Sequence, residues 1–254
     1  MDPFDVQRRP FELGHALVAS LRITWAELPK LFVLAFVFAI PAAALQVALV
    51  PEGDDFKAVA ASIRVSNFYD LVVGELGAQA MVALFIARAE GRVLSLGASL
   101  RESAACWTRA VGAQFRSSLW VVFGLVLLII PGLWKLTTLM FVSVAVLRVP
   151  GRDALKVSEA LVEGRFARCF GFGAVLVGVF LLPQFIGSVV MGIVTEGLET
   201  PRFLAEFVDD LLGRLLLNGA LTSALYVGFL MLHRSAGLEL PAMQWREQPP
   251  LSQG

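Results

Sequence analysis

The chain has 254 residues, of which 57% are hydrophobic and 17% charged, and its 21 basic and 21 acidic residues cancel. A soluble domain is nearer half apolar and a quarter charged, so the long charge-poor stretches of this chain exclude a soluble globular protein and predict an all-α integral membrane protein. The zero net charge implies no bulk attraction to nucleic acid, and no nucleic-acid partner is expected.

Five apolar blocks are long enough to enter a bilayer as helices, because a span needs about 20 predominantly apolar residues. In chain order they are residues 31–50, 68–87, 119–147, 170–194 and 211–232. Proline interrupts the first block at Pro41 and the fourth at Pro183. We expect residues 1–240 to form a single polytopic membrane domain and residues 241–254 to form a disordered tail.

Three segments before these blocks have the pattern of amphipathic helices: residues 13–28, 96–115 and 153–169. In each, apolar residues recur at steps of three and four, while the basic residues lie on other faces. Such helices either lie in the headgroup plane or pack on one another as cytoplasmic helices. Each leads into a block interrupted by proline, which indicates three units of an amphipathic helix and a helical pair.

The block 119–147 carries one charge, Lys135, and a Pro131-Gly132 pair near its middle. As a single helix it would reach ~43 Å, whereas the hydrocarbon core of a bilayer is ~30 Å thick. Proline cannot continue the hydrogen-bond ladder and glycine tolerates a sharp turn, so we expect a helical hairpin that turns at Pro131 and Gly132. Trp134 and Lys135 are typical of a bilayer interface.

The distribution of Lys and Arg also favours two crossings in this block. Residues 88–116 and 148–168 are rich in arginine, whereas the loops 51–67 and 195–206 contain few basic residues. Since cytoplasmic loops are enriched in Lys and Arg, two crossings put every basic segment on one side. About six membrane segments with both termini in the cytoplasm follow.

The arms of this hairpin are short. Each has about 14 apolar residues, or ~21 Å of helix. The arms extend into their flanks, or the membrane thins locally, or the hairpin is re-entrant and covered by protein. The sequence leaves these three alternatives open.

Glu75 is an acid inside a spanning block, where charge is costly and usually faces a bundle interior or an aqueous path. It is either a structural polar contact or part of a polar path with Gln79, Arg214 and Asn218. Arg214 is a candidate partner for Glu75, although Asp210 at i−4 can satisfy it locally. These four residues are the candidate intramembrane polar group.

Other polar residues have simpler interpretations. Gln46 is a lone amide in apolar surroundings, and we expect it to hydrogen-bond between helices. Asp209 and Asp210 are expected at the solvated outer mouth of the last helix rather than in a metal pair.

No catalytic, cofactor or metal signature is present in the sequence. Cys106 and Cys169 form no CxxC motif, and His15 and His233 lie at opposite ends of the chain, away from any candidate nucleophile. We therefore expect no enzymatic activity, no cofactor and no bound metal.

The stretch 130–170 resembles a bacterial membrane family called the glycerophosphoryl diester phosphodiesterase membrane domain. The resemblance rests on a proline-glycine turn, a valine-rich run and an "AL..S..L..G" helix, here Pro131, Gly132, 142–149, Ala154, Leu155, Ser158, Leu161 and Gly164. A closing helix with Tyr226 and Arg234 is similar to that family's last helix. The resemblance implies a six-segment helical domain in the bacterial inner membrane. It does not imply phosphodiester hydrolysis, because the family name comes from proteins in which this domain is fused to a separate soluble enzyme.

Two functions agree with these features. The first is a non-enzymatic multi-pass membrane protein that scaffolds or modulates lipids or other membrane proteins. The alternative is a small transporter or channel with a polar path around Glu75 and Arg214. In both cases the bilayer of the bacterial inner membrane is the expected partner.

Overall fold

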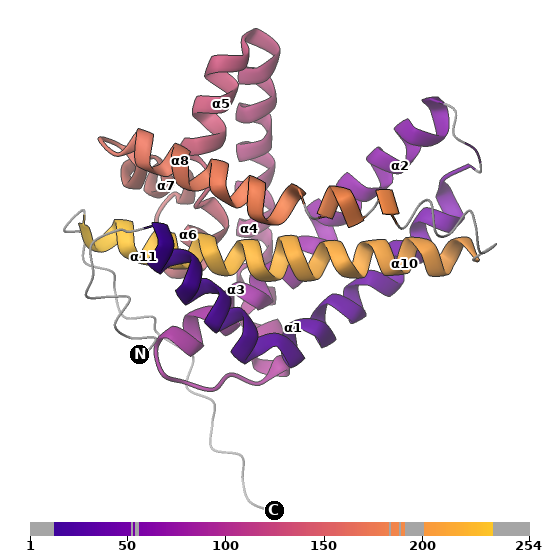
Figure 1. Ribbon diagram of the computed structural model, residues 1–254, viewed down its shortest axis with the longest axis horizontal. Coiled ribbons are helices and arrows are strands. Elements are labelled where there is room, and N and C mark those ends of the chain that lie inside the picture. The colour runs from indigo at the N-terminus through magenta and orange to yellow at the C-terminus, as the bar shows by residue number, and fades with distance from the viewer. Residues whose placement is uncertain are drawn as a thin grey trace, which may run out of the picture.

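The computed structural model describes residues 13–51, 53, 56–182, 184–187, 189–190 and 201–235. These residues are almost entirely helical and contain no strand (Figure 1). Six helical stretches among them are long and apolar enough to cross a membrane, as the sequence predicted. The expected disordered tail at 241–254 lies outside the described residues, and so does the end of the block 170–194.

From α1 to η3 the described helices follow one another with short connections, and three of the described segments are π-helical and carry the letter η. In chain order the elements are α1 (Leu13–Leu49), α2 (Phe56–Tyr69), η2 (Asp70–Gly74), α3 (Glu75–Ala89), α4 (Leu96–Leu127), α5 (Ile129–Thr138), α6 (Val142–Arg148), α7 (Ala154–Val162), α8 (Phe166–Leu176), η3 (Val177–Leu181), α10 (Arg202–Gly213), η4 (Arg214–Leu221) and α11 (Thr222–Ser235). Each η segment continues a neighbouring α-helix, so the helix becomes wider over that turn but does not end there.

The first amphipathic segment is not a separate helix, contrary to the sequence prediction. It is continuous with the first apolar block in α1, which contains Pro29 and Pro41 and bends along its length (Figure 1). A proline inside a helix removes one hydrogen bond and kinks the axis, but packing on both sides of the kink keeps the chain helical. Here α1 packs against α3 and along α10, η4 and α11.

The second amphipathic segment is likewise not a separate helix. It continues into the first arm of the predicted hairpin, and the two form the single helix α4. Among its large apolar residues, Phe115 is exposed and Trp107 is only partly buried. Small side chains are buried instead: Ala98, Ser99, Ser103, Cys106, Ala110, Ala113 and Ser117. Small residues let helix backbones approach closely, and this face packs on α3.

The hairpin itself is present, but its turn lies earlier than predicted. Between α4 and α5 a single extended residue, Leu128 (φ −164°, ψ 145°), reverses the chain. Pro131 lies in the first turn of α5, where a missing N–H costs no helical hydrogen bond. Gly132 faces Gly124 across the hairpin, and a Cβ built on Gly124 would lie 2.9 Å from the backbone of Gly132. The Pro-Gly pair therefore starts the second arm and permits close packing, while Leu128 makes the turn.

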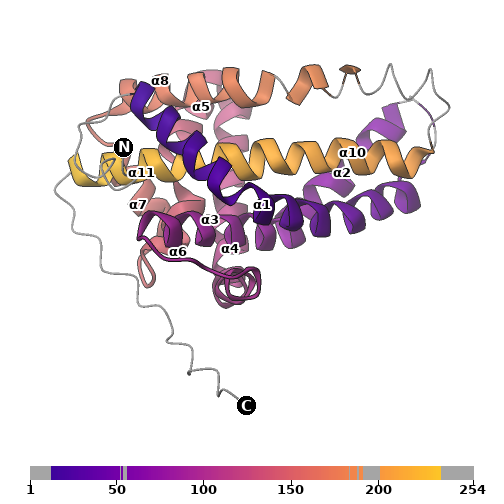
Figure 2. The same ribbon diagram turned by 60° about the horizontal axis from the view of Figure 1, so that its bottom comes forward.

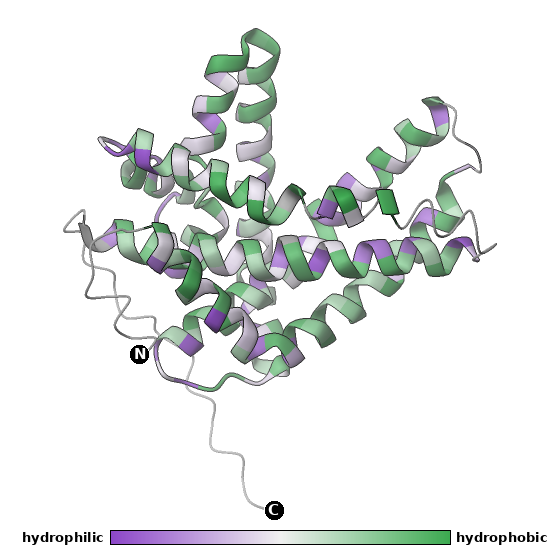
Figure 3. Ribbon diagram, viewed as in Figure 1, coloured by the Kyte–Doolittle hydropathy of each residue, from purple (hydrophilic) through white to green (hydrophobic). Residues whose placement is uncertain are grey.

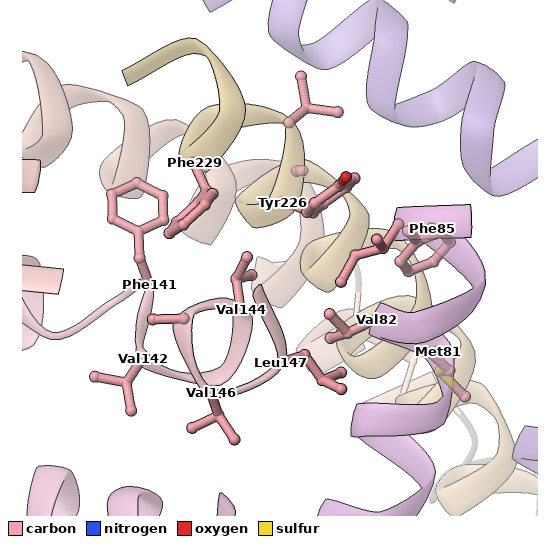
Figure 4. Close-up of a cluster of buried hydrophobic side chains, with 14 of the residues drawn as sticks. Met81, Val82, Phe85, Phe141, Val142, Val144, Val146, Leu147, Tyr226 and Phe229 are labelled. Atoms are coloured by element: carbon pink, nitrogen blue, oxygen red, sulfur yellow. The ribbon is translucent and has the colours of Figure 1, made fainter. Parts of the chain in front are cut away.

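The core centres on α3, in which twelve of the 15 residues are buried. A helix that is apolar on all sides belongs inside a bundle. Figure 4 shows Met81, Val82 and Phe85 of α3 beside residues of α6 and its N-terminal flank and the aromatic rings of α11. Phe141 and Phe229 meet edge to face with ring centroids 6.3 Å apart. This cluster joins segments that are far apart in the sequence.

One end of the bundle brings together charged residues from three basic regions. Glu27 of α1 pairs with Lys30 at 2.7 Å and with Arg88 at 3.8 Å. Glu90 pairs with Arg148 at 2.6 Å, which ties the end of α3 to the end of α6. The beginning of α1 and the end of α11 also lie at this end of the molecule in both views (Figures 1 and 2).

Candidate functional site

A polar cavity of about 130 Å³ lies between α1, α2 and α10, toward the end of the bundle where α1 ends and α10 begins. Its wall consists of Ala42, Ala43, Gln46, Ser62, Val65, Ser66, Tyr69, Asp70, Glu206, Asp209, Asp210 and Arg214. A cavity needs roughly 10–15 Å³ for one water molecule, so this one has room for a small solute or several waters. All of its helices belong to candidate membrane spans.

Arg214 anchors the cavity wall. Its Nε donates to Oδ2 of Asp210 at 2.6 Å, and its Nη2 donates to Oδ1 of Asp210 at 3.1 Å and to Oδ1 of Asp70 at 3.0 Å. The guanidinium carbon lies 5.0 Å from the centre of the Tyr69 ring, in cation–π range. Arg214 is buried and joins helices 144 positions apart in the sequence, so it fixes α10 and η4 against η2.

Two π-helical segments begin at residues of this site: Asp70 opens η2 and Arg214 opens η4. A π-helical turn leaves the carbonyl groups around it with an altered set of partners, and such turns occur frequently at functional sites. Across η2, α4 supplies new donors: Trp107 Nε1 bonds Val72 O at 2.6 Å and Ser103 Oγ bonds Leu76 O at 2.5 Å. These bonds hold the widened turn in place beside the cavity.

Gln46 bridges α1 and α2, as the sequence predicted for a lone amide. Its Nε2 donates to the carbonyl O of Ser62 at 3.3 Å and also contacts Oγ of Ser66. Its Oε1 is buried and has no hydrogen-bond partner among the described residues. A buried acceptor without a partner is unusual in a folded protein.

Glu75 and Gln79 lie outside this cavity and face other helices. Gln79 Nε2 donates to Oε1 of Glu75 at 2.7 Å and to the carbonyl O of Ser143 at 3.2 Å. Both side chains are buried. Within the described chain, Arg214 pairs with Asp210 and Asp70. Of the two partners that the sequence left open, Asp210 is therefore the one confirmed.

The four candidate polar residues are therefore separated. Glu75 and Gln79 form an i,i+4 contact on α3, Arg214 lines the cavity, and Asn218 is partly buried one turn further along η4. Asp209 and Asp210 are half-buried in the cavity wall rather than fully solvated. No group of three or more His, Cys, Asp or Glu side chains that could hold a metal ion occurs in the described part of the chain.

Sequence reasoning missed Asp70 and Tyr69 as site residues. Asp70 lies just inside the second apolar block, five residues before Glu75, and an acid at that position was a usable signal. What the sequence could not supply was its partner, because the contact with Arg214 spans 144 positions.

No protein family, no curated protein and no solved structure matches this chain. The resemblance of residues 130–170 to a known family therefore stays a prediction.

Proposed function

We propose that this protein is a non-enzymatic multi-pass membrane protein that holds lipids or neighbouring membrane proteins through its α4–α5 hairpin. The observation that carries the proposal is the apolar surface of the hairpin. Around its turn, large side chains are exposed on every side: Val126, Leu127, Leu128, Ile129 and Ile130. Figure 3 shows this end of the hairpin as continuously hydrophobic. An apolar surface of this extent is a binding surface or is covered by lipid.

The direction of the hairpin supports placement within the bilayer. The hairpin stands crosswise to α10, η4 and α11 (Figure 1). The hairpin helices and the α10–α11 stretch therefore cannot both run along the membrane normal. With α1 and α10–α11 along the normal, the hairpin extends sideways into lipid. This arrangement shares with the re-entrant alternative that both ends of the hairpin stay at the bundle, but its turn is exposed to lipid rather than covered by protein.

Lys135, the only charged residue of the block 119–147, is neutralised where the second arm of the hairpin meets the bundle. Lys135 Nζ lies 2.7 Å from Oε1 of Glu159 in α7 and 5.6 Å from the centre of the Trp120 ring. Trp134 stacks on Phe166 with centroids 4.1 Å apart. Charges at membrane depth are normally paired in this way, which makes an intramembrane position of the hairpin physically acceptable.

The proposed orientation has both termini in the cytoplasm of a bacterial cell, with the protein in the inner membrane. The arginine-rich regions support it, since their residues Arg88, Arg92 and Arg148 meet at the bundle end where α1 begins and α11 ends. Cytoplasmic sides of membrane proteins carry this excess of basic residues.

Placement of the hairpin in lipid is tested with two positions of equal exposure. Ile130 at the hairpin turn and Val93 in the link before α4 are each 80% exposed. In proteoliposomes, Val93→Cys is expected to react readily with a water-soluble maleimide and Ile130→Cys at least tenfold more slowly, because lipid excludes the reagent. The native Cys106 and Cys169 are buried, so the unmodified chain gives the background. Equal labelling of both positions would place the hairpin in water and remove the basis of the proposal.

A second function, transport of a small polar solute, is favoured by the cavity beside Arg214. Transporters bind substrates at interrupted helices within the membrane, and two of the helical stretches that line this cavity contain π-helical segments. The cavity residues also pair charges inside candidate spans, as functional intramembrane charges do.

Transport is tested by solute uptake into proteoliposomes across a panel of small cations, anions and neutral polar solutes. We expect saturable uptake of one class, reduced about tenfold by Arg214→Lys, which keeps the charge but loses the bidentate geometry. Glu75→Gln, outside the cavity, is expected to leave uptake unchanged. Folded protein that moves no solute of the panel would rule out this second function.

A further inference from the structure

We propose that the first half of α4 binds the phosphate groups of anionic phospholipids through Arg101, Arg109 and Arg116. These three residues are called the arginine face below. The inference rests on the proposed placement of the hairpin in lipid and deepens it by naming the class of lipid that is held.

The arginine face is a single side of α4. At 3.6 residues per turn, Arg116 and Arg109 lie about 60° and about 80° around the helix axis from Arg101. All three residues are exposed, and they extend along about 22 Å of helix. The small residues that pack on α3, such as Ser103 and Ala110, occupy a different side. The arginines are therefore presented outward from the bundle.

The charge of the arginine face is largely uncompensated. Within the described part of the chain, no ion pair joins Arg101 or Arg109 to an acidic residue. Arg116 lies 3.7 Å from Asp153 in a loose pair, and its side chain stays 56% exposed. The sequence of α4 contains one acid, Glu102, against these three arginines. A guanidinium binds phosphate oxygens through two parallel hydrogen bonds, so a phosphate group complements this face in both charge and geometry.

The outward side of α4 changes from arginine to hydrocarbon near Trp120. Beyond this residue the same side continues with Phe123, Val126 and Leu127, which are exposed and apolar. Tryptophan is enriched where headgroups meet acyl chains, and long basic side chains reach from there to the headgroups. We therefore place α4 near one surface of the bilayer, with its arginines at the phosphates and its hairpin end among the acyl chains. A phospholipid beside α4 contacts both parts.

Arg152 extends this basic surface toward α7. It is exposed and precedes Asp153, which caps α7 and is the partner of Arg116. Four positions before Arg152, Arg148 pairs with Glu90 at the end of the bundle where the arginine-rich regions meet. The arginine face thus adjoins the bundle end for which a cytoplasmic location is proposed, and the anionic lipids of the cytoplasmic leaflet attract basic segments.

Lipid selectivity is tested by thermal unfolding of the purified full chain in a neutral detergent. Phosphatidylglycerol and phosphatidylcholine with the same acyl chains are titrated separately at constant ionic strength. We expect a saturable rise in Tm with phosphatidylglycerol and a much smaller one with phosphatidylcholine, because a ligand that binds only the folded state stabilises it. The rise is expected to shrink at high salt, since exposed charges are screened. Inorganic phosphate is expected to have little effect, because it has no acyl chain to pack beside the hairpin.

Matched double variants show whether the effect belongs to the arginine face. Arg101→Gln/Arg109→Gln removes two exposed charges from α4 and is expected to weaken the apparent affinity for phosphatidylglycerol about tenfold or more. The control, Lys57→Gln/Arg64→Gln, removes two exposed charges from α2 and is expected to leave this affinity unchanged. Arg101→Lys/Arg109→Lys keeps both charges and is expected to lose less affinity than the glutamine pair. All four positions are exposed, so the variants are expected to fold.

Four results would overturn the proposal: equal effects of the two lipids, a rise that does not saturate, an equal rise with inorganic phosphate, or an unchanged affinity in Arg101→Gln/Arg109→Gln. The maleimide test at Ile130 is independent of these measurements. Saturable phosphatidylglycerol binding with a water-exposed hairpin would retain the lipid site and reject the placement of the hairpin. A lipid-shielded hairpin without lipid selectivity would do the reverse.

Discussion

Replacing Gly132 with leucine is expected to force α4 and α5 apart. A Cβ at this position would lie 2.5 Å from Cγ and Cδ2 of Leu125 and 2.7 Å from its backbone N. A side chain can change rotamer, but the backbone of a packed hairpin cannot yield without separating the arms. Overpacking of this kind costs about 1–3 kcal/mol, and the backbone contact puts Gly132→Leu at the upper end.

The matched control is Gly112→Leu, in the middle of α4, where an added Cβ would meet no atom within 4 Å. Both changes replace glycine in a helix and gain the same helix propensity, about 0.8 kcal/mol, so their difference isolates the steric effect. Thermal unfolding in one detergent measures it. Equal Tm values for the two variants would mean that the close Gly124–Gly132 approach does not exist in solution.

Replacing Arg214 with methionine is expected to be the most damaging change in the polar cavity. It removes the partner of Asp210 and Asp70 and the cation that stacks on Tyr69. Breaking a fully buried ion pair costs about 3–5 kcal/mol, but the side chains of Asp70 and Asp210 are 58% and 28% exposed. Solvent screening reduces the expected loss of unfolding free energy to about 2 kcal/mol.

The double variant Arg214→Met/Asp210→Asn is expected to recover part of this loss, because it also removes a carboxylate left without a partner. Arg116→Met is the control, since Arg116 is 56% exposed and lies 3.7 Å from Asp153 in a surface pair worth about 0–1 kcal/mol. Tm values of the unmodified chain, of Arg214→Met and Asp210→Asn, and of the double variant give the coupling energy. A loss for Arg214→Met no larger than that for Arg116→Met would contradict the buried cluster.

Features set by neighbouring residues were predictable from the sequence. The i,i+4 pair of Asp210 and Arg214 follows from helix geometry alone. The bridging role of Gln46 follows from the cost of an unbonded amide in an apolar block. The helical hairpin in 119–147 was also correct, although its turn is Leu128 rather than the Pro-Gly pair, because a proline is tolerated in the first turn of the following helix.

Features that depend on contacts between distant segments were not predictable. The amphipathic pattern in 96–115 left open whether this helix lies in the headgroup plane or packs on other helices, and only the structure shows that its small residues pack on α3. Likewise, the sequence offered Glu75 and Asp210 as partners of Arg214 and did not indicate Asp70, which reaches Arg214 from η2.

The sequence by itself determined that this chain is helical, that six of its helices are long and apolar enough to cross a membrane, and that its basic residues are concentrated in particular segments. Hydrophobicity and helical periodicity are local properties, and the cost of charge in hydrocarbon acts on each segment separately. Only the tertiary structure showed that α1 and α4 are each one uninterrupted helix and that the hairpin stands crosswise to α10 and α11. It also showed that Gln46, Asp70 and Arg214 line one cavity. These outcomes depend on which surfaces pack together. The local sequence around a residue does not specify a partner that lies more than a hundred positions away in the chain.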